Sequence, residues 1–205
     1  MTNDLGTLTG KHHYYPYGTE YAPGQDESLQ NIHPGALVTT SENTRQWQHL
    51  SRFIQLSDIQ NEAETQTPTA LFGNPPPGTI VRRLRGGKMR SLQGLMDEFG
   101  AALQFFEGFG ENWHALKECL SYLDEWLPAD QYILLIPSSH QVLIDDPSQL
   151  KWLLKTLHEV GQWWLEPITD NEPFNRPSKG FKAIFATMPE LFDTTLRRFE
   201  SAYRS

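Results

Sequence analysis

The sequence predicts an α/β fold: a small, three-stranded, mainly parallel sheet with packed helices, preceded by an N-terminal extension of mixed or irregular structure. Three short apolar segments alternate with longer segments in which apolar residues recur at helical spacing. The resulting order (strand, helix, helix, strand, helix, strand, helix) requires crossover connections, which join parallel strands. Hydrophobic residues make up 38% of the 205 residues, which is enough for a core.

The three predicted strands differ in their patterns. Residues 79–84, TIVRRL, place Arg82 and Arg83 on opposite faces, because successive side chains of a strand alternate. Residues 132–137, YILLIP, are apolar throughout, which is typical of a strand covered on both faces. Residues 181–186, FKAIFA, form the third strand.

The first two helices follow the first strand. Ser91 is the expected N-cap of a helix whose apolar residues run from Leu92 to Phe106. Asn112 is the expected N-cap of the next helix, whose buried stripe starts at Trp113 and ends at Leu127. A loop, EGFG, separates these two helices.

The last two helices also carry start signals. Asp146 is the expected cap of a helix that has Pro147 in its first position and an apolar face that extends to Trp164. Thr187 and Glu190 form a capping box at the start of the final helix.

Three consecutive prolines in NPPPGT mark the predicted domain boundary. They prevent a helix and favour an extended spacer, so we expect residues 1–75 to be an N-terminal extension or accessory module and residues 76–205 to be the main domain. The extension is rich in Tyr, Gly and Pro, but Trp47, Leu50 and Ile54 fall at helical spacing. We expect this module to enlarge the binding surface or to cover a polar face of the sheet.

Composition excludes several classes of protein. The net charge of −8 repels nucleic acid and favours a basic partner. Cys119 is the only cysteine, so the chain can form neither an internal disulfide nor a cysteine-based zinc site, and we expect Cys119 to be a small buried hydrophobe. No apolar run has the length of a membrane span and the first residues do not resemble a secretion signal, so we expect a cytoplasmic protein with no membrane partner.

Other functional interpretations have weak support. His12, His13 and His33 lack the Cys or carboxylate frame of a metal site, so we expect no metal and no cofactor. A basic cluster could bind nucleic acid, but against the net charge it is better interpreted as a solvated strand end or a contact for the N-terminal segment; it comprises Arg82, Arg83, Arg85, Lys88 and Arg90. The chain has no glycine-rich phosphate loop, serine elbow or paired-carboxylate motif, so we expect no enzyme.

An acidic row is the remaining feature. Glu111, Glu118 and Glu125 are spaced seven residues apart, nearly two helical turns, so one helix would align them on the side opposite Trp113. A solvated helix face and a binding surface both explain such a row.

Residues 79–186 resemble the barstar family, intracellular inhibitors of the ribonuclease barnase. The segment FGENWHALKECL is similar to that family's signature of an aromatic residue, Gly-Glu-Asn, Asp-Ala-Leu and an acid followed by Cys-Leu. The turn LRGGKMRS and the helix SLQGLMDEFGAALQFF also resemble its opening unit. The resemblance implies inhibition by occlusion, in which the loop and second helix enter the nuclease active site and their carboxylates pair with its cationic groups.

The resemblance also implies a partner-binding surface with Phe109 as its exposed aromatic anchor. The residues are Phe109, Gly110, Glu111, Asn112, His114, Glu118, Tyr122 and Glu125. Two positions depart from the family: His114 replaces an acid, and Lys117 replaces an aromatic residue. His114 is then an interface donor, a pH-sensitive contact or a surface residue, and the target differs from barnase or has another chemistry.

The function expected from these observations is that of an antitoxin or immunity protein, monomeric when free, which blocks a basic, nuclease-like toxin made by the same bacterium. Two alternatives are a regulatory or scaffolding module that binds a protein other than a toxin, and a nucleic-acid binder that uses the basic cluster. The gene adjacent to this one would distinguish them, because a large secreted protein with a C-terminal toxic domain favours immunity.

Overall fold

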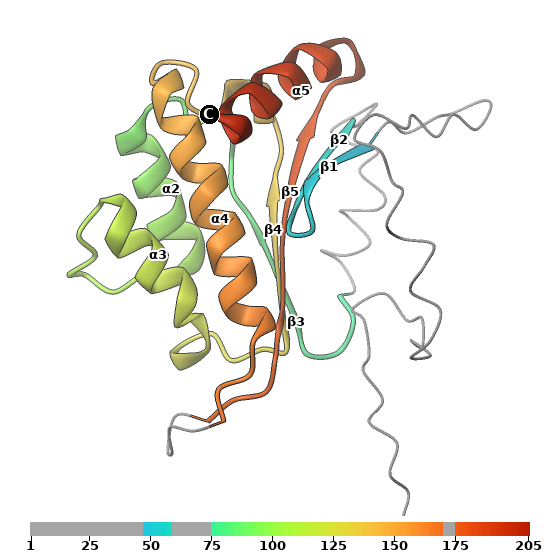
Figure 1. Ribbon diagram of the computed structural model, residues 1–205. Coiled ribbons are helices and arrows are strands. Elements are labelled where there is room, and N and C mark those ends of the chain that lie inside the picture. The colour runs from blue at the N-terminus through green and yellow to red at the C-terminus, as the bar shows by residue number, and fades with distance from the viewer. Residues whose placement is uncertain (1–46, 59–74, 170–174) are drawn as a thin grey trace, which may run out of the picture. The chain divides into compact units, whose positions relative to one another are not determined.

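The computed structural model describes residues 47–58, 75–169 and 175–205, and these residues build a five-stranded sheet packed against helices (Figure 1). The order across the sheet is β1-β2-β5-β4-β3. The strands are β1 (Trp47–Ser51), β2 (Ile54–Asp58), β3 (Thr79–Arg83), β4 (Gln131–Ile136) and β5 (Gly180–Thr187).

The α/β class and the three predicted strands are confirmed, and the sheet is larger than expected. β3, β4 and β5 are the predicted strands, and they pair in parallel. β2 adds to the far side of β5 in parallel, and β1 pairs with β2 antiparallel, so the sheet is mixed. The helical interpretation of Trp47, Leu50 and Ile54 is wrong, because buried Ile54 and Leu56 alternate with less buried neighbours at the period of a strand.

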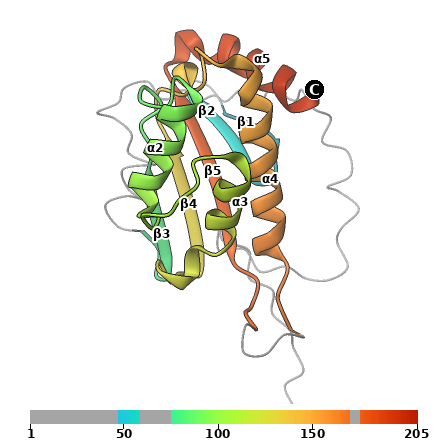
Figure 2. The ribbon, with the colours of Figure 1, turned by 90° about the vertical axis from the view of Figure 1, so that its left-hand side faces the viewer.

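The described residues also form four helices: α2 (Leu92–Leu103), α3 (Trp113–Ser121), α4 (Leu150–Leu165) and α5 (Pro189–Arg204). Short 3₁₀ turns lie between them: η1 (Leu123–Glu125), η2 (Ser139–Gln141) and η3 (Pro147–Gln149). Figure 1 shows α2, α3 and α4 on one face of the sheet, with α5 beyond the end where β5 finishes. Figure 2 views the helical face from outside, with the strands behind the helices. No helix in the described ranges has the length and hydropathy needed to span a bilayer.

The core lies between the sheet and the helices of this face. β4 is buried from Tyr132 to Ile136, as its uniformly apolar sequence predicts. The sheet contributes Ile54, Leu56, Tyr132, Leu134, Ile136 and Phe185. The helices contribute Leu95, Phe99, Leu116, Leu120, Leu153, Leu157 and Trp164.

The β1–β2 hairpin is anchored on α4 by Phe53, which is 7% exposed. A Cβ atom on Gly161 of α4 would lie 2.6 Å from both Cδ atoms of the Phe53 ring, so only glycine admits the ring at this depth. The ring also meets His158 edge-on, with centroids 5.6 Å apart, and the Nδ1 atom of His158 lies 3.1 Å from the Tyr203 hydroxyl. Residues on the N-terminal side of the predicted boundary therefore pack into this core, and the division between residues 75 and 76 stays a prediction.

Two of the predicted side-chain caps are confirmed and two do not form. The Ser91 hydroxyl accepts a hydrogen bond from the Gly94 amide at 3.2 Å, as expected of an N-cap. The second confirmed cap is Asn112, at the start of α3. Asp146 occupies the N-cap position of η3, which leads into α4, and Pro147 follows it as predicted, but its side chain makes no cap hydrogen bond. Its carboxylate instead accepts from the Leu92 amide at 2.7 Å and joins this loop to the start of α2.

The capping box expected at α5 does not form. Met188 is the N-cap residue and makes no side-chain cap, and Pro189 begins the helix. The Thr187 hydroxyl is buried and lies 3.2 Å from Nδ1 of His140, so a tertiary contact replaces the local one.

Candidate functional site

Asn112 fixes the start of α3, as the sequence predicts. Its Oδ1 atom accepts hydrogen bonds from the amides of His114 and Ala115 at 3.1 and 3.0 Å. Its Nδ2 group donates to the Gly110 carbonyl at 2.8 Å. One side chain therefore satisfies the first turn of the helix and holds the preceding loop against it.

The loop between α2 and α3 starts and ends at residues in the left-handed region. Gln104, with φ of 57°, ends α2, and Glu111, with φ of 47°, precedes the cap of α3. Such a conformation in a non-glycine residue costs on the order of 1 kcal/mol or more, so surrounding contacts must maintain it. At Glu111 that contact is a 2.7 Å hydrogen bond, which the carboxylate accepts from Nε2 of Gln93 on α2.

The exposed aromatic residue of this loop is Phe106, and the expectation that it would be Phe109 is wrong. Phe109 is half-buried and meets Phe105 edge-on at 4.9 Å, and Phe105 in turn meets Trp126 at 6.0 Å. Phe106 is 61% exposed. Because α2 ends at Leu103, Phe106 falls in the loop rather than on the apolar face of the helix to which its spacing assigned it.

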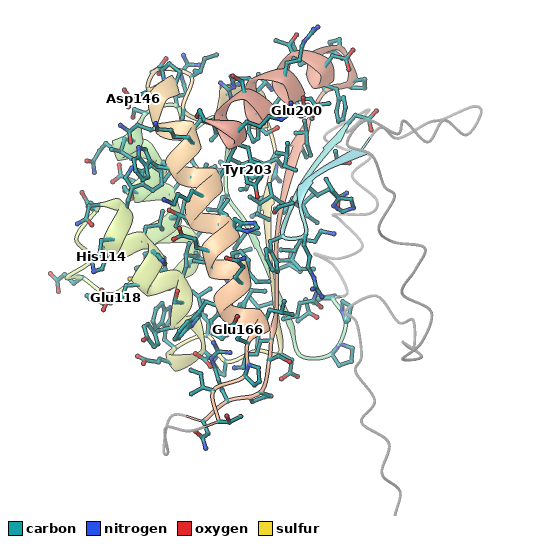
Figure 3. All side chains as sticks on the ribbon, viewed as in Figure 1. His114, Glu118, Asp146, Glu166, Glu200 and Tyr203 are labelled. Atoms are coloured by element: carbon teal, nitrogen blue, oxygen red, sulfur yellow. The ribbon has the colours of Figure 1, made fainter. Side chains whose placement is uncertain are left out.

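The three glutamates of the acidic row do not share one helix. α3 contains nine residues and ends at Ser121, so Glu111 precedes it and Glu125 belongs to η1. Of the three, Glu118 alone lies on α3; it is exposed, and its carboxylate forms no hydrogen bond or ion pair with the described part of the chain. Figure 3 shows Glu118 and His114 on the outer side of α3, away from the sheet.

The cation beside Glu118 is neutralised by another helix. The Lys117 ammonium pairs with the carboxylate of Glu159 on α4 at 2.7 Å. Lys155 approaches the same carboxylate at 3.9 Å. Lys117 therefore joins α3 to α4, and the Glu118 carboxylate remains available to a partner.

A comparison with protein-family models matches residues 79–201 to the barstar family, described as the barnase inhibitor. The chain belongs to the barstar family. The match starts at the first residue of β3 and ends within α5, so the β1–β2 hairpin lies outside it. Members of this family inhibit a ribonuclease and are not enzymes, which fits the class of partner and the absence of catalysis expected from the sequence. A comparison with curated protein sequences found no match.

The inner side of α3 in this barstar domain belongs to the core, as predicted. Leu116 and Leu120 are fully buried. Burial, with a smaller effect of the neighbouring Glu118 charge, raises the pKa of the Cys119 thiol, so Cys119 is a buried hydrophobe rather than a nucleophile. Trp113 is half-buried against the core, and its indole N–H donates to Oε1 of Gln149 at 2.9 Å.

Tyr122 extends the outer surface of the barstar domain beyond the end of α3. It is 44% exposed and meets Trp163 of α4 edge-on at 6.0 Å. The Trp163 indole donates to the Ser121 carbonyl at 2.9 Å, and the Arg176 guanidinium lies 5.3 Å from the indole ring. The helical spacing correctly places Trp164 on the buried face of α4, but the sequence does not predict that Trp163 contributes to this outer surface.

Two members of the basic cluster form ion pairs within the barstar domain. The Arg85 guanidinium binds Glu98 through Nε and Nη2, with a shortest distance of 2.7 Å, and the Arg85 amide donates to the same carboxylate. Burial alone would raise the pKa of Glu98, but the hydrogen bonds and charge of Arg85 lower it overall. Arg90 forms a second ion pair, with Asp145, at 2.8 Å.

The three histidines considered as metal ligands, His12, His13 and His33, lie outside the described residues. Within residues 47–58, 75–169 and 175–205, no group of three or more His, Cys, Asp or Glu side chains is arranged to hold a metal ion.

Proposed function

We propose that this barstar-family protein is an antitoxin or immunity protein that binds a toxic ribonuclease in the bacterial cytoplasm and covers its active site. The loop after α2 and the outer face of α3 form the inhibitory surface. Complex formation is stoichiometric, and no bond of the toxin is changed.

The observation that carries this proposal is that the Glu118 side chain is exposed and has no partner among the described residues. Its carboxylate is exposed on α3, while the adjacent cation, Lys117, is engaged by Glu159. An unpaired carboxylate on a rigid helix can accept charge-assisted, often bidentate hydrogen bonds from a guanidinium group. The arginine, lysine and histidine side chains with which a ribonuclease holds RNA phosphate offer such donors. In the complex, the Glu118 carboxylate therefore takes the place of an RNA phosphate.

Surrounding charges favour the same kind of partner. Glu107, Glu111 and Glu125 are exposed on the loop and on η1, and the chain has a net charge of −8. An acidic surface accelerates encounter with a basic enzyme and makes the association rate sensitive to salt. A surface that repels nucleic acid also avoids competition from RNA itself.

His114 sets the choice of target. It occupies the position of a family acid, is exposed on the first turn of α3, and its side chain forms no hydrogen bond with the described residues. An imidazole can donate to a carbonyl or a carboxylate, whereas an acid cannot donate when ionised. The preferred ribonuclease therefore differs from barnase opposite this position.

Titration of the protein into barnase, and into other small bacterial ribonucleases, tests the proposal by residual RNA cleavage. Inhibition should be complete at a one-to-one ratio, and both proteins should be recovered unmodified by mass spectrometry. A substoichiometric amount that abolishes cleavage, or a covalent change in the ribonuclease, would indicate an enzyme. Absence of inhibition across the set would favour a regulatory or scaffolding role.

A further inference from the structure

Phe106 is the most exposed large apolar side chain in the described residues, at 61%. It lies between α2 and α3, in the loop of the inhibitory surface. Single exposed apolar residues are common on proteins, so exposure alone does not indicate a binding role. The contacts and charges around Phe106 support a binding role.

Neighbouring residues of the loop restrict Phe106. On either side, Phe105 and Phe109 turn inward and pack against each other and the core. The Phe109 amide donates to the Phe106 carbonyl at 3.0 Å. A Cβ atom on Gly108 would lie 3.1 Å from Cε2 of Phe106, so the ring rests on the backbone of Gly108. A side chain fixed before binding loses little conformational entropy when a partner covers it.

Carboxylates flank the ring. Glu107 follows it directly, and Glu111, held by Gln93, ends the same loop. Residues 106–111 contain no cation. The loop therefore presents an apolar ring next to negative charge, which complements an apolar pocket with a cationic rim.

Enzymes that act on RNA have such a pocket, because they stack the base on apolar or aromatic groups and bind the phosphate with cations. We propose that Phe106 enters the base-binding pocket of the target ribonuclease while the neighbouring carboxylates face its phosphate-binding cations. The loop then imitates a nucleotide, with the ring in place of the base. This inference rests on the proposed function and specifies which part of the active site the loop fills.

The first test compares wild-type protein, Phe106→Ala and Met188→Ala by calorimetry, against each ribonuclease that the wild type inhibits. Met188 is 47% exposed and lies at the start of α5, away from the loop. A central aromatic anchor contributes at least about 25-fold in affinity, so Phe106→Ala should weaken binding by that factor and Met188→Ala should not. Equal melting temperatures of the three proteins show that folding is intact.

The second test identifies the pocket by competition with adenosine, guanosine, cytidine and uridine, which carry no phosphate. A nucleoside that binds the ribonuclease should weaken its binding of wild-type protein and leave its binding of Phe106→Ala unchanged, while inorganic phosphate should weaken both. Wild-type affinity of Phe106→Ala, or equal competition by nucleosides against both proteins, would overturn this inference and leave the proposed function standing. Failure of the wild type to inhibit any ribonuclease tested would overturn both.

Discussion

Replacement of Gly161 by alanine tests the docking of the β1–β2 hairpin on α4. The added Cβ would lie 2.6 Å from both Cδ atoms of Phe53 and closer still to Cγ. Gly161 lies on the buried face of α4, whose backbone is held by the packing of that face, so the ring must leave its site. Phe53 is 7% exposed in the native packing, and its displacement opens the contact that holds the hairpin.

The expected loss follows from two opposing effects. Removing a buried phenylalanine ring from a core costs about 3 to 5 kcal/mol. Alanine gains about 1 kcal/mol over glycine within a helix. Gly161→Ala should therefore reduce the free energy of unfolding by about 2 to 4 kcal/mol, which corresponds to a fall in melting temperature of about 4 to 16 °C for a chain of this size.

Two controls separate the clash from helix propensity. Gly100 also lies in a helix, but a Cβ there would be 3.7 Å from its nearest neighbour, Cδ1 of Phe109. Gly100→Ala should therefore stabilise the protein by up to about 1 kcal/mol. In a Phe53→Ala background the aromatic ring is absent, so the effect of Gly161→Ala on the free energy of unfolding should change sign and become stabilising.

Urea unfolding of the four variants, monitored by far-ultraviolet circular dichroism, measures these differences. A strong coupling between residues 53 and 161 in the double-mutant cycle is the expected result. If Gly161→Ala stabilises the otherwise wild-type protein as much as Gly100→Ala does, Phe53 does not occupy this site and the hairpin is held elsewhere.

Three further predictions concern binding, pH and domain organisation. Glu118→Ala should weaken ribonuclease binding by about 2 to 5 kcal/mol in calorimetry, because it leaves a buried cation of the ribonuclease unpaired. Glu125→Ala, at the rim of the interface, should change mainly the association rate. Equal effects of the two substitutions on affinity would exclude Glu118 as the central charge. The lowered pKa of Glu98 means that its contribution to stability is present above its unfolded pKa of about 4.5 and is lost as pH falls through the folded pKa, so wild type and Glu98→Gln should converge in urea unfolding at acid pH. A truncated protein of residues 77–205 should unfold cooperatively but at lower urea concentration than residues 41–205, since it lacks the buried side chains of β2; precipitation or loss of the transition would place the boundary N-terminal to the hairpin.

Local chemistry explains which parts of the fold the sequence predicts correctly. Ser91 and Asn112 precede helices and carry short oxygen-bearing side chains, so their capping follows from neighbouring amides. The strand of residues 131–136 is recognisable because burial on both faces requires apolar residues throughout. These signals depend on contacts within a few residues.

Non-local contacts explain the errors. The β1–β2 hairpin depends on pairing of β2 with β5, far along the chain, and the helical spacing of its apolar residues is coincidental. Thr187 bonds to His140 instead of the local backbone because both lie near the carboxyl end of the sheet. The prediction that one helix aligns the three glutamates is wrong because α3 ends at Ser121. Neither glycine nor proline marks that end as a stop signal in the sequence. The Tyr122 amide instead shares its hydrogen bond between the carbonyls of residues 118 and 119.

α4 connects the hairpin outside the family match to the proposed inhibitory surface. Figure 1 shows α4 between α3 on one side and β1 and β2 on the other. Gly161 receives Phe53 from the hairpin, while Glu159, two residues earlier, binds Lys117 beside Glu118. Trp163, two residues later, donates to the last residue of α3. The hairpin can therefore stiffen the proposed binding helix without contacting a partner, because rigid support of a binding surface reduces the entropy lost on association.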